Sequence, residues 1–242
     1  MGAEVVTYAS YTRNTVEPLK RIAHSRRYEQ VLRIIAAPLP GDKVLDYGCG
    51  DGHLFSHLVG NVSSDKLVGY DPNADLLAQA DPAVVAGSSL TTDIDTLKAQ
   101  HSRSFSLIYC IEVCEHLTDK ALDELFENIT ALAAPYARII VGVPIETGPS
   151  GFLKGMYRTA HGHRQAASMT KAVRALFGLQ IPRSVTYQEW YGDHTGFNHA
   201  RLREKLEDRG LLVKRSVCLP FPLFGLALNN EIYFTCSRRR PS

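Results

Sequence analysis

The chain has 242 residues, of which 45% are hydrophobic, and this is enough to bury the core of one ordinary α/β domain. The formal net charge is only +2, so bulk charge does not favour a nucleic-acid-binding protein. The five cysteines lack paired spacing, which argues against a disulfide framework or a zinc motif. The first residues lack the basic and then apolar pattern of a secretory signal, so we expect one cytoplasmic domain over residues 1–242.

Residues 1–40 are expected to form an N-terminal helical cap. A polar start precedes a helix from about Glu17, and Pro38 and Pro40 end that helix. Its apolar stripe is Leu19, Ile22, Val31, Leu32 and Ile35.

The segment from Val44 to Leu54 is the clearest pattern in the chain. A short apolar run ends at Asp46 and Tyr47, glycines follow at 48, 50 and 52, and an apolar segment begins after them. This order predicts a buried parallel strand, a tight turn and the start of a helix. Glycine permits positive φ and lets a ligand lie against bare backbone, and a helix N-terminus presents unpaired N–H groups. We therefore expect a nucleotide-like cofactor to bind here.

Two carboxylates narrow the identity of that cofactor. The glycine spacing is not the Gly-x-Gly-x-x-Gly of dinucleotide-binding proteins, and no Gly-Lys-Ser/Thr of a P-loop follows. Asp71 ends the next predicted strand, 66–70, and is placed to accept both hydroxyls of a ribose. Asp46 would repel a pyrophosphate but suits an ammonium group. A ribose and an ammonium group without a phosphate describe S-adenosylmethionine.

Four segments together resemble the motifs of class I S-adenosylmethionine-dependent methyltransferases, in particular type 11 or UbiG-like members. They are VLDYGCGDG (44–52), VGYDP (68–72), FSLIYCIEVCEHL (105–117) and RIIVGVP (138–144). The resemblance implies an α/β, Rossmann-like, seven-stranded, mostly parallel sheet with helices on both faces and an antiparallel last strand. Two late strands, near 211–217 and 230–237, would complete the sheet. The cofactor site that it implies consists of Asp46, Gly48, Cys49, Gly50, Gly52, Asp71, Pro72, Ser88, Ser89 and Cys110.

The chain departs from this family's pattern at three places. Ser106 stands where an Asp is usual, and Ser88 stands where an acid often contacts the adenine. The turn at 134–137 reads Ala-Pro-Tyr-Ala and lacks the common Pro-Gly-Gly. Adenine recognition is therefore left to Ser88, Ser89 or backbone groups.

A second group of functional residues is Glu112, Glu115 and His116, which follow a predicted strand and begin a predicted helix. Positions i, i+3 and i+4 share one helical face, so these side chains can converge beside the reactive methyl group. One possible chemistry is proton removal from an acceptor hydroxyl by His116, supported by the two carboxylates. The other is a divalent metal ion that orients and acidifies the hydroxyl.

A later histidine, His194, lies in a turn-rich loop ahead of a helix that starts near His199. The Glu-x-x-Glu-His element followed by a later His resembles two metal-dependent branches of the family. These are the ubiquinone-pathway O-methyltransferases and the small-RNA terminal 2′-O-methyltransferases. The resemblance implies that Mg²⁺ or Mn²⁺ is bound by Glu112, Glu115, His116 and His194. Metal-free catalysis by His116 and a purely structural role for the element remain alternatives.

Residues 147–190 are expected to form an inserted lid over the acceptor. No Asp or Glu occurs from Thr147 to Gln188, and residues 166–179 predict an amphipathic helix. The basic side chains of the lid are Lys154, Arg158, Arg164, Lys171, Arg174 and Arg183. The predicted apolar face of the helix is Met169, Val173, Leu176 and Phe177. A basic lid favours an anionic acceptor, and the alternative is a helix buried on its own domain with solvated basic residues.

Residues 217–228 are unusually apolar for a connection between strands. They can line an acceptor pocket, contact a membrane or partner, or form a buried hairpin. A lipid-linked anionic acceptor would suit both this segment and the lid, with peripheral membrane contact through 152–179 and 219–228.

Three functions remain open on the sequence. The leading one is O-methylation of a small or lipid-linked anionic acceptor. The second is RNA 2′-O-methylation, which the Glu/Glu/His/His pattern favours and the near-neutral charge disfavours. The third is a non-catalytic, cofactor-binding partner subunit, which the departures at Ser88 and Ser106 would permit.

Overall fold

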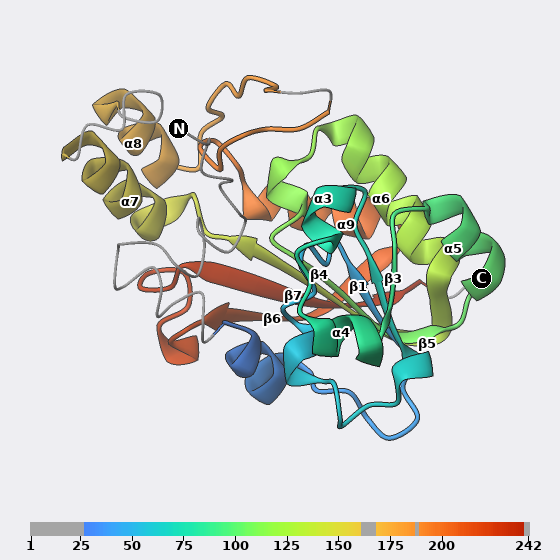
Figure 1. Cartoon of the computed structure of the whole chain (residues 1–242). Helices are drawn as coiled ribbons and strands as arrows, with labels where there is room; N and C mark the ends of the chain where they lie inside the picture. Colours follow the sequence, from blue (N-terminus) through green and yellow to red (C-terminus); the bar gives the residue numbers. More distant parts are fainter. Residues whose placement is uncertain (1–26, 161–167, 187–188, 240–242) are drawn as a thin grey trace, which may run out of the picture.

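One seven-stranded sheet organises the protein in the computed structural model, which describes residues 27–160, 168–186 and 189–239 (Figure 1). The strand order is β3-β2-β1-β4-β5-β7-β6. Strands β1 to β5 pair in parallel, whereas β7 is antiparallel to both β5 and β6. The expected α/β fold with an antiparallel last strand is confirmed. The strands are β1 (Val44–Tyr47), β2 (Leu67–Tyr70), β3 (Ser89–Thr91), β4 (Phe105–Ile111), β5 (Ala133–Pro144), β6 (Leu211–Leu219) and β7 (Glu231–Arg238).

Helices cover both faces of the sheet. The α-helices are α3 (Ala74–Leu77), α4 (Pro82–Gly87), α5 (Ile94–His101), α6 (Asp119–Leu132), α7 (Gly148–Ala160), α8 (Met169–Leu176) and α9 (His199–Asp208). A π-helical turn, η1 (Val31–Ile35), precedes β1, and the 3₁₀ turns are η2 (Phe55–His57), η3 (Ser64–Lys66), η4 (Cys114–His116) and η5 (Pro222–Phe224). No helix of the described segments is long and apolar enough to cross a membrane.

The sheet separates two hydrophobic cores, because successive strand residues point to opposite faces. In β4, Ile108 packs with α5, α6 and α9, whereas Leu107 and Tyr109 pack with η1, η2 and α4. Phe126 of α6 is fully buried in the first core. This two-sided burial explains why the parallel strands read as almost continuous apolar runs.

Two predicted helices differ from the observed ones. The first 26 residues of the expected 1–40 cap lie outside the described residues, and the described helical residues 27–30 continue into η1. The turn after β1 leads to the single 3₁₀ turn η2 rather than to an α-helix. The lid helix expected at 166–179 is observed as α8, Met169–Leu176.

The lid helix also faces the other way from the sequence prediction. Its buried residues are Ala172 and Ala175, and Leu176 is half-buried, whereas Met169, Val173 and Phe177 of the predicted apolar face are exposed. The alanines lie inward because α8 packs closely on α7, where a Cβ on Gly155 would come within 2.8 Å of the Ala172 Cβ. Side-chain hydrophobicity alone could not indicate that the small residues form the contact.

Replacing Phe126 with alanine should lower the free energy of unfolding by ~3–5 kcal/mol, because the cavity forms in a fully packed core. Phe177→Ala is the matched control, since that ring is 70% exposed and its loss should cost no more than ~0.5 kcal/mol. Urea denaturation followed by tryptophan fluorescence measures both. Similar losses for the two variants would contradict the assignment of the core.

Candidate functional site

The glycine turn after β1 is tied to the end of β2. Gly48, Gly50 and Gly52 all have positive φ, at 82°, 55° and 72°. The N–H groups of Gly48 and Cys49 both donate to the Tyr70 carbonyl oxygen, at 2.7 and 3.0 Å. Only glycine adopts this run of left-handed conformations without strain, so the turn places bare backbone at the carboxyl edge of the sheet.

Three buried carboxyl groups lie at this turn. The Asp46 carboxyl group is buried and is repelled by the carboxylates of Asp71 and Asp51. Burial together with these two neighbours raises the pKa of Asp46 to about 8. Burial also raises the pKa of Asp71, against the effect of hydrogen bonds from the N–H groups of Asn73 and Gly50, both 2.9 Å long. A carboxylate has about four acceptor positions, so Asp71 retains capacity for ligand hydroxyls. The arrangement suits a ligand that brings a positive charge and a diol.

The other expected cofactor residues lie in three different environments. Ser88 and Ser89 are at the amino end of β3, and the Ser88 hydroxyl donates to the Val84 carbonyl oxygen at 2.6 Å. This position is at the amino edge of the sheet, opposite the edge that holds the glycine turn, so the expected contact of both serines with adenine stays a prediction that the geometry does not favour. Cys110 is fully buried in the core, with its Sγ 3.9 Å from the Cys114 Sγ, whereas Pro72 is exposed just after β2.

The carboxyl end of β3 leads instead to Thr92 and Asp93. The Asp71 N–H donates to the Thr91 carbonyl oxygen at 3.2 Å, which places this end of β3 beside Asp71. Asp93 is the N-cap of α5 and accepts from the N–H groups of Asp95 and Thr96. The sequence pattern that marks Asp93 is an acid just after a short strand, as at Asp46 and Asp71.

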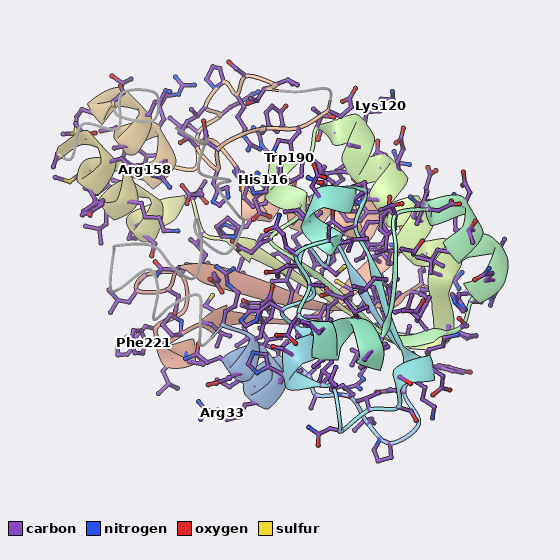
Figure 2. The ribbon with its side chains drawn as sticks, in the orientation of Figure 1. Arg33, His116, Lys120, Arg158, Trp190 and Phe221 are labelled. Atoms are coloured by element: carbon purple, nitrogen blue, oxygen red, sulfur yellow. The ribbon has the colours of Figure 1, made fainter. Side chains whose placement is uncertain are left out.

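Glu115, His116 and His194 form a compact cluster after β4 (Figure 2 labels His116). The Nε2 atoms of the two histidines are 3.1 Å apart, and each lies 4.0 Å from Glu115 Oε1. His116 Nδ1 is 2.9 Å from the Tyr191 carbonyl oxygen. Because a carbonyl oxygen only accepts, Nδ1 carries the proton and Nε2 of His116 offers a lone pair to the cluster.

Trp190 fixes the plane of the His116 ring. The two rings are stacked, with centroids 4.4 Å apart and planes within 3° (Figure 2). The backbone holds the same segment in place, because the Tyr191 N–H donates to the His116 carbonyl oxygen at 2.6 Å. Sequence analysis missed Trp190, although it is the only tryptophan and lies four residues before His194.

Burial controls the charge of this cluster. Glu115 is completely buried, and within the described segments neither of its carboxyl oxygens has a hydrogen-bond partner. Burial, followed by repulsion from Glu112, raises the pKa of Glu115. Burial lowers the pKa of His116, and it lowers the pKa of His194 to about 3 with a contribution from His116. Both imidazoles are therefore neutral near pH 7 and can accept a proton or bind a cation.

Glu112 does not join the cluster, which corrects the expected four-residue metal set. It has a left-handed φ of 60° and precedes η4, so the i, i+3, i+4 spacing of an α-helix does not apply. Its carboxylate lies 3.3 Å from Arg27 Nη2, and Arg27 also pairs with Glu231 at 2.6 Å. Burial raises the pKa of Glu112 to about 7, and Arg27 opposes that rise. Sequence analysis missed Arg27, which no local pattern connects with β4.

The basic residues of the lid have partners within the protein. Glu146, just outside the acid-free stretch, accepts from Lys154 at 3.2 Å and from Arg158 at 2.7 Å. The Arg174 guanidinium donates to the Gln180 carbonyl oxygen, and Arg183 donates to the carbonyl oxygens of Glu115 and Asp193. These contacts are structural, so the basic composition of the lid does not by itself create an anion site. Arg164, His161 and His163 lie outside the described residues.

Comparison with solved structures shows the same fold in several methyltransferases. Magnesium protoporphyrin IX methyltransferase from Synechocystis PCC 6803, with bound SAH, has a TM-score of 0.58 and 17% identity over 98% of this chain and 90% of that one. The PH0226 protein from Pyrococcus horikoshii OT3 has a TM-score of 0.59 and 13% identity over 96% of each chain. The methyltransferase domain of bacterial CtHen1 has a TM-score of 0.55 and 17% identity over 88% of this chain and 98% of that one.

The sequence itself matches a family model, described as a methyltransferase domain, over residues 20–210. No curated protein matches the chain. The matched range includes the glycine turn, the acid after β2 and the cluster after β4. The chain belongs to this methyltransferase-domain family and is a class I S-adenosylmethionine-dependent methyltransferase.

Proposed function

We propose that the enzyme methylates a hydroxyl oxygen of a small or lipid-linked acceptor at the Glu115–His116–His194 cluster. The observation that carries the proposal is the contact between this cluster's segment and the cofactor turn. A Cβ on Gly48 would lie 2.3 Å from Val113 Cγ2, so the turn packs directly against the residue between Glu112 and Cys114. A cofactor on the turn would therefore present its methyl group beside the cluster.

The chain's own residues supply what the reaction needs apart from the methyl donor. The sulfonium is already reactive, so the protein has to align the acceptor with the methyl group and exclude water. The Nδ1–H of His116 donates a hydrogen bond to the Tyr191 carbonyl oxygen, so the lone pair of the ring is on Nε2, which faces the cluster. It can take the hydroxyl proton while Trp190 holds the ring plane.

The same three residues fit a divalent metal ion. Their ligand atoms all lie within 4.8 Å of one another, and the buried Glu115 oxygens have no hydrogen-bond partner in the part of the chain that the structure describes. Two neutral imidazoles and a carboxylate suit Mn²⁺ better than Mg²⁺, which prefers oxygen ligands. Such an ion, when bound, would orient and acidify the acceptor hydroxyl. With the ion bound, His116 Nε2 is a ligand and not the base, and the ion itself activates the hydroxyl. We include the ion in the proposal as a three-residue site without Glu112.

The cofactor end of the site should show a proton linkage at Asp46. Burial and two neighbouring carboxyl groups give Asp46 a pKa of about 8, so without a nearby positive charge the carboxyl group is mostly protonated below that pH. The ammonium group of the cofactor would favour the ionised form, so binding should release a proton, and affinity should rise with pH.

Between about pH 6 and about pH 7.5, we expect the affinity for S-adenosylhomocysteine to rise by up to about tenfold per pH unit. Asp46→Asn should remove this pH dependence and weaken binding. Calorimetry in two buffers of different ionisation enthalpy measures the released proton directly. If the unmodified enzyme takes up a proton on binding, or neither takes up nor releases one, the assignment of the ammonium group to Asp46 is refuted.

Methyl transfer from labelled S-adenosylmethionine into cell extract should be lost in EDTA and restored by Mn²⁺. Glu115→Gln and His194→Ala should each lower the rate at least about 100-fold, because each removes one of the three proposed metal ligands. Mn²⁺ binding, measured by electron paramagnetic resonance, should be lost in Glu115→Gln but kept in the matched control Glu112→Gln.

Separating the labelled extract into lipid, small-molecule and RNA fractions tests the acceptor. Label in the lipid or small-molecule fraction is the expected result. Label confined to RNA and lost on ribonuclease treatment would favour the 2′-O-methyltransferase alternative, and full transfer in EDTA would reject the metal.

A further inference from the structure

An exposed apolar surface lies on the lid and on the connection between β6 and β7. Its main side chains are Leu153 and Met156 of α7, Val173 and Phe177 of α8, and Leu223 and Phe224 of η5. Leu223 is 97% exposed, which is exceptional for leucine in a folded protein. The alternative of a buried hairpin at 217–228 is therefore wrong for its tip. We call these six side chains the apolar surface.

The two parts of the apolar surface are joined by hydrogen bonds. The Ser150 hydroxyl of α7 donates to the carbonyl oxygens of Leu226 and Ala227, at 2.8 and 3.1 Å. Lys154 also donates to the Asn230 carbonyl oxygen at 3.3 Å. Figure 1 shows α7, α8 and the β6–β7 connection at the same end of the sheet. The lid and the connection therefore form one continuous part of the molecule.

The orientation of α8 indicates that its larger apolar side chains have a partner outside the described chain. This helix buries Ala172 and Ala175 and half-buries Leu176, but it exposes Val173, and Phe177 directly after the helix is exposed as well. A helix stabilised only by its own domain would bury the larger side chains, since burial free energy increases with apolar area. Contiguous apolar side chains on the solvent-exposed surface of a protein are typical of protein or membrane contact sites.

The charge of the lid favours a negatively charged partner. No Asp or Glu occurs in residues 147–188 or in the uncharged segment 216–230, and the lid carries Lys171 and Arg174 in addition to Lys154, which pairs with Glu146. A basic, amphipathic surface with apolar side chains at its centre is typical of proteins that bind anionic lipid. A second copy of this chain would bring two positive surfaces together, so charge disfavours a symmetric dimer through this face.

We propose that the apolar surface docks the enzyme on an anionic bilayer. The helix α7 begins four residues after β5 ends, at the edge of the sheet that also holds the catalytic cluster. Docking would thus place the site against the lipid, where a lipid-linked acceptor can enter without crossing water. Only the entry of a lipid-linked acceptor rests on the proposed function. Docking itself does not depend on catalytic activity.

The test is co-sedimentation of the full chain with vesicles, without cofactor or acceptor. Equal parts of phosphatidylcholine and phosphatidylglycerol form the anionic vesicles, and pure phosphatidylcholine forms the neutral ones. The enzyme should bind the anionic vesicles, and added salt should weaken that binding. The double variant Leu223→Asp, Phe224→Asp should bind about tenfold more weakly or worse, as should Phe177→Asp.

Val85→Asp is the matched control, because Val85 is 56% exposed on α4, outside the apolar surface. It should bind vesicles like the unmodified enzyme, and all variants should keep their affinity for S-adenosylhomocysteine if they fold. Absence of vesicle binding, or equal binding by every variant, would overturn the proposal. Sedimentation velocity gives a further check. A dimer that is formed by the unmodified enzyme and lost in the Leu223→Asp, Phe224→Asp variant would overturn the proposal in favour of self-association. Failed methyl transfer with intact vesicle binding would count against the proposed function alone.

Discussion

The packing of Gly48 against Val113 is the constraint on which the two halves of the site depend. The first residue of the glycine turn lacks a Cβ, and any Cβ there would meet Val113 Cγ2 at 2.3 Å. Because of this contact, the glycine turn after β1 packs directly against the segment that carries the cluster after β4. The adjacency of β1 and β4 in the sheet makes it possible, since the strand order reverses between them. The contact at Gly48 thus sets the distance between the glycine turn and the cluster.

The buried Glu115 carboxyl group then limits what the cluster can hold. Its Oε1 is 4.0 Å from the Nε2 atoms of His116 and His194, which is too far for a hydrogen bond. A charged carboxylate without a partner is very costly in such a position, so it is either neutral or faces a ligand. The space between the three side chains suits one atom that contacts all of them. An acceptor oxygen and a divalent cation both meet this requirement.

The sequence predicted the strands and the cofactor turn well because local patterns determine them. Asp46 and Asp71 ended apolar runs, and both lie where the parallel strands end. The roles of Ser88 and Glu112 were harder to predict, because they depend on the register of a three-residue strand and on a distant arginine. Arg27 is 85 positions before Glu112, and only the folded chain brings the two together. The lid helix was misjudged for a similar reason, since close approach of two helices selects small residues rather than large ones.

The lid also shows how one composition can serve two purposes. Its basic residues were expected to bind an anionic acceptor, yet Lys154 and Arg158 neutralise the buried Glu146. Burial alone would raise the pKa of Glu146, but these two cations lower it, so the carboxylate stays charged and anchors α7. An anchored α7 supports α8 with its large apolar side chains outward. The internal ion pairs therefore stabilise the exposed surface, and selection for that surface would explain why the lid contains no acid to repel an anionic partner.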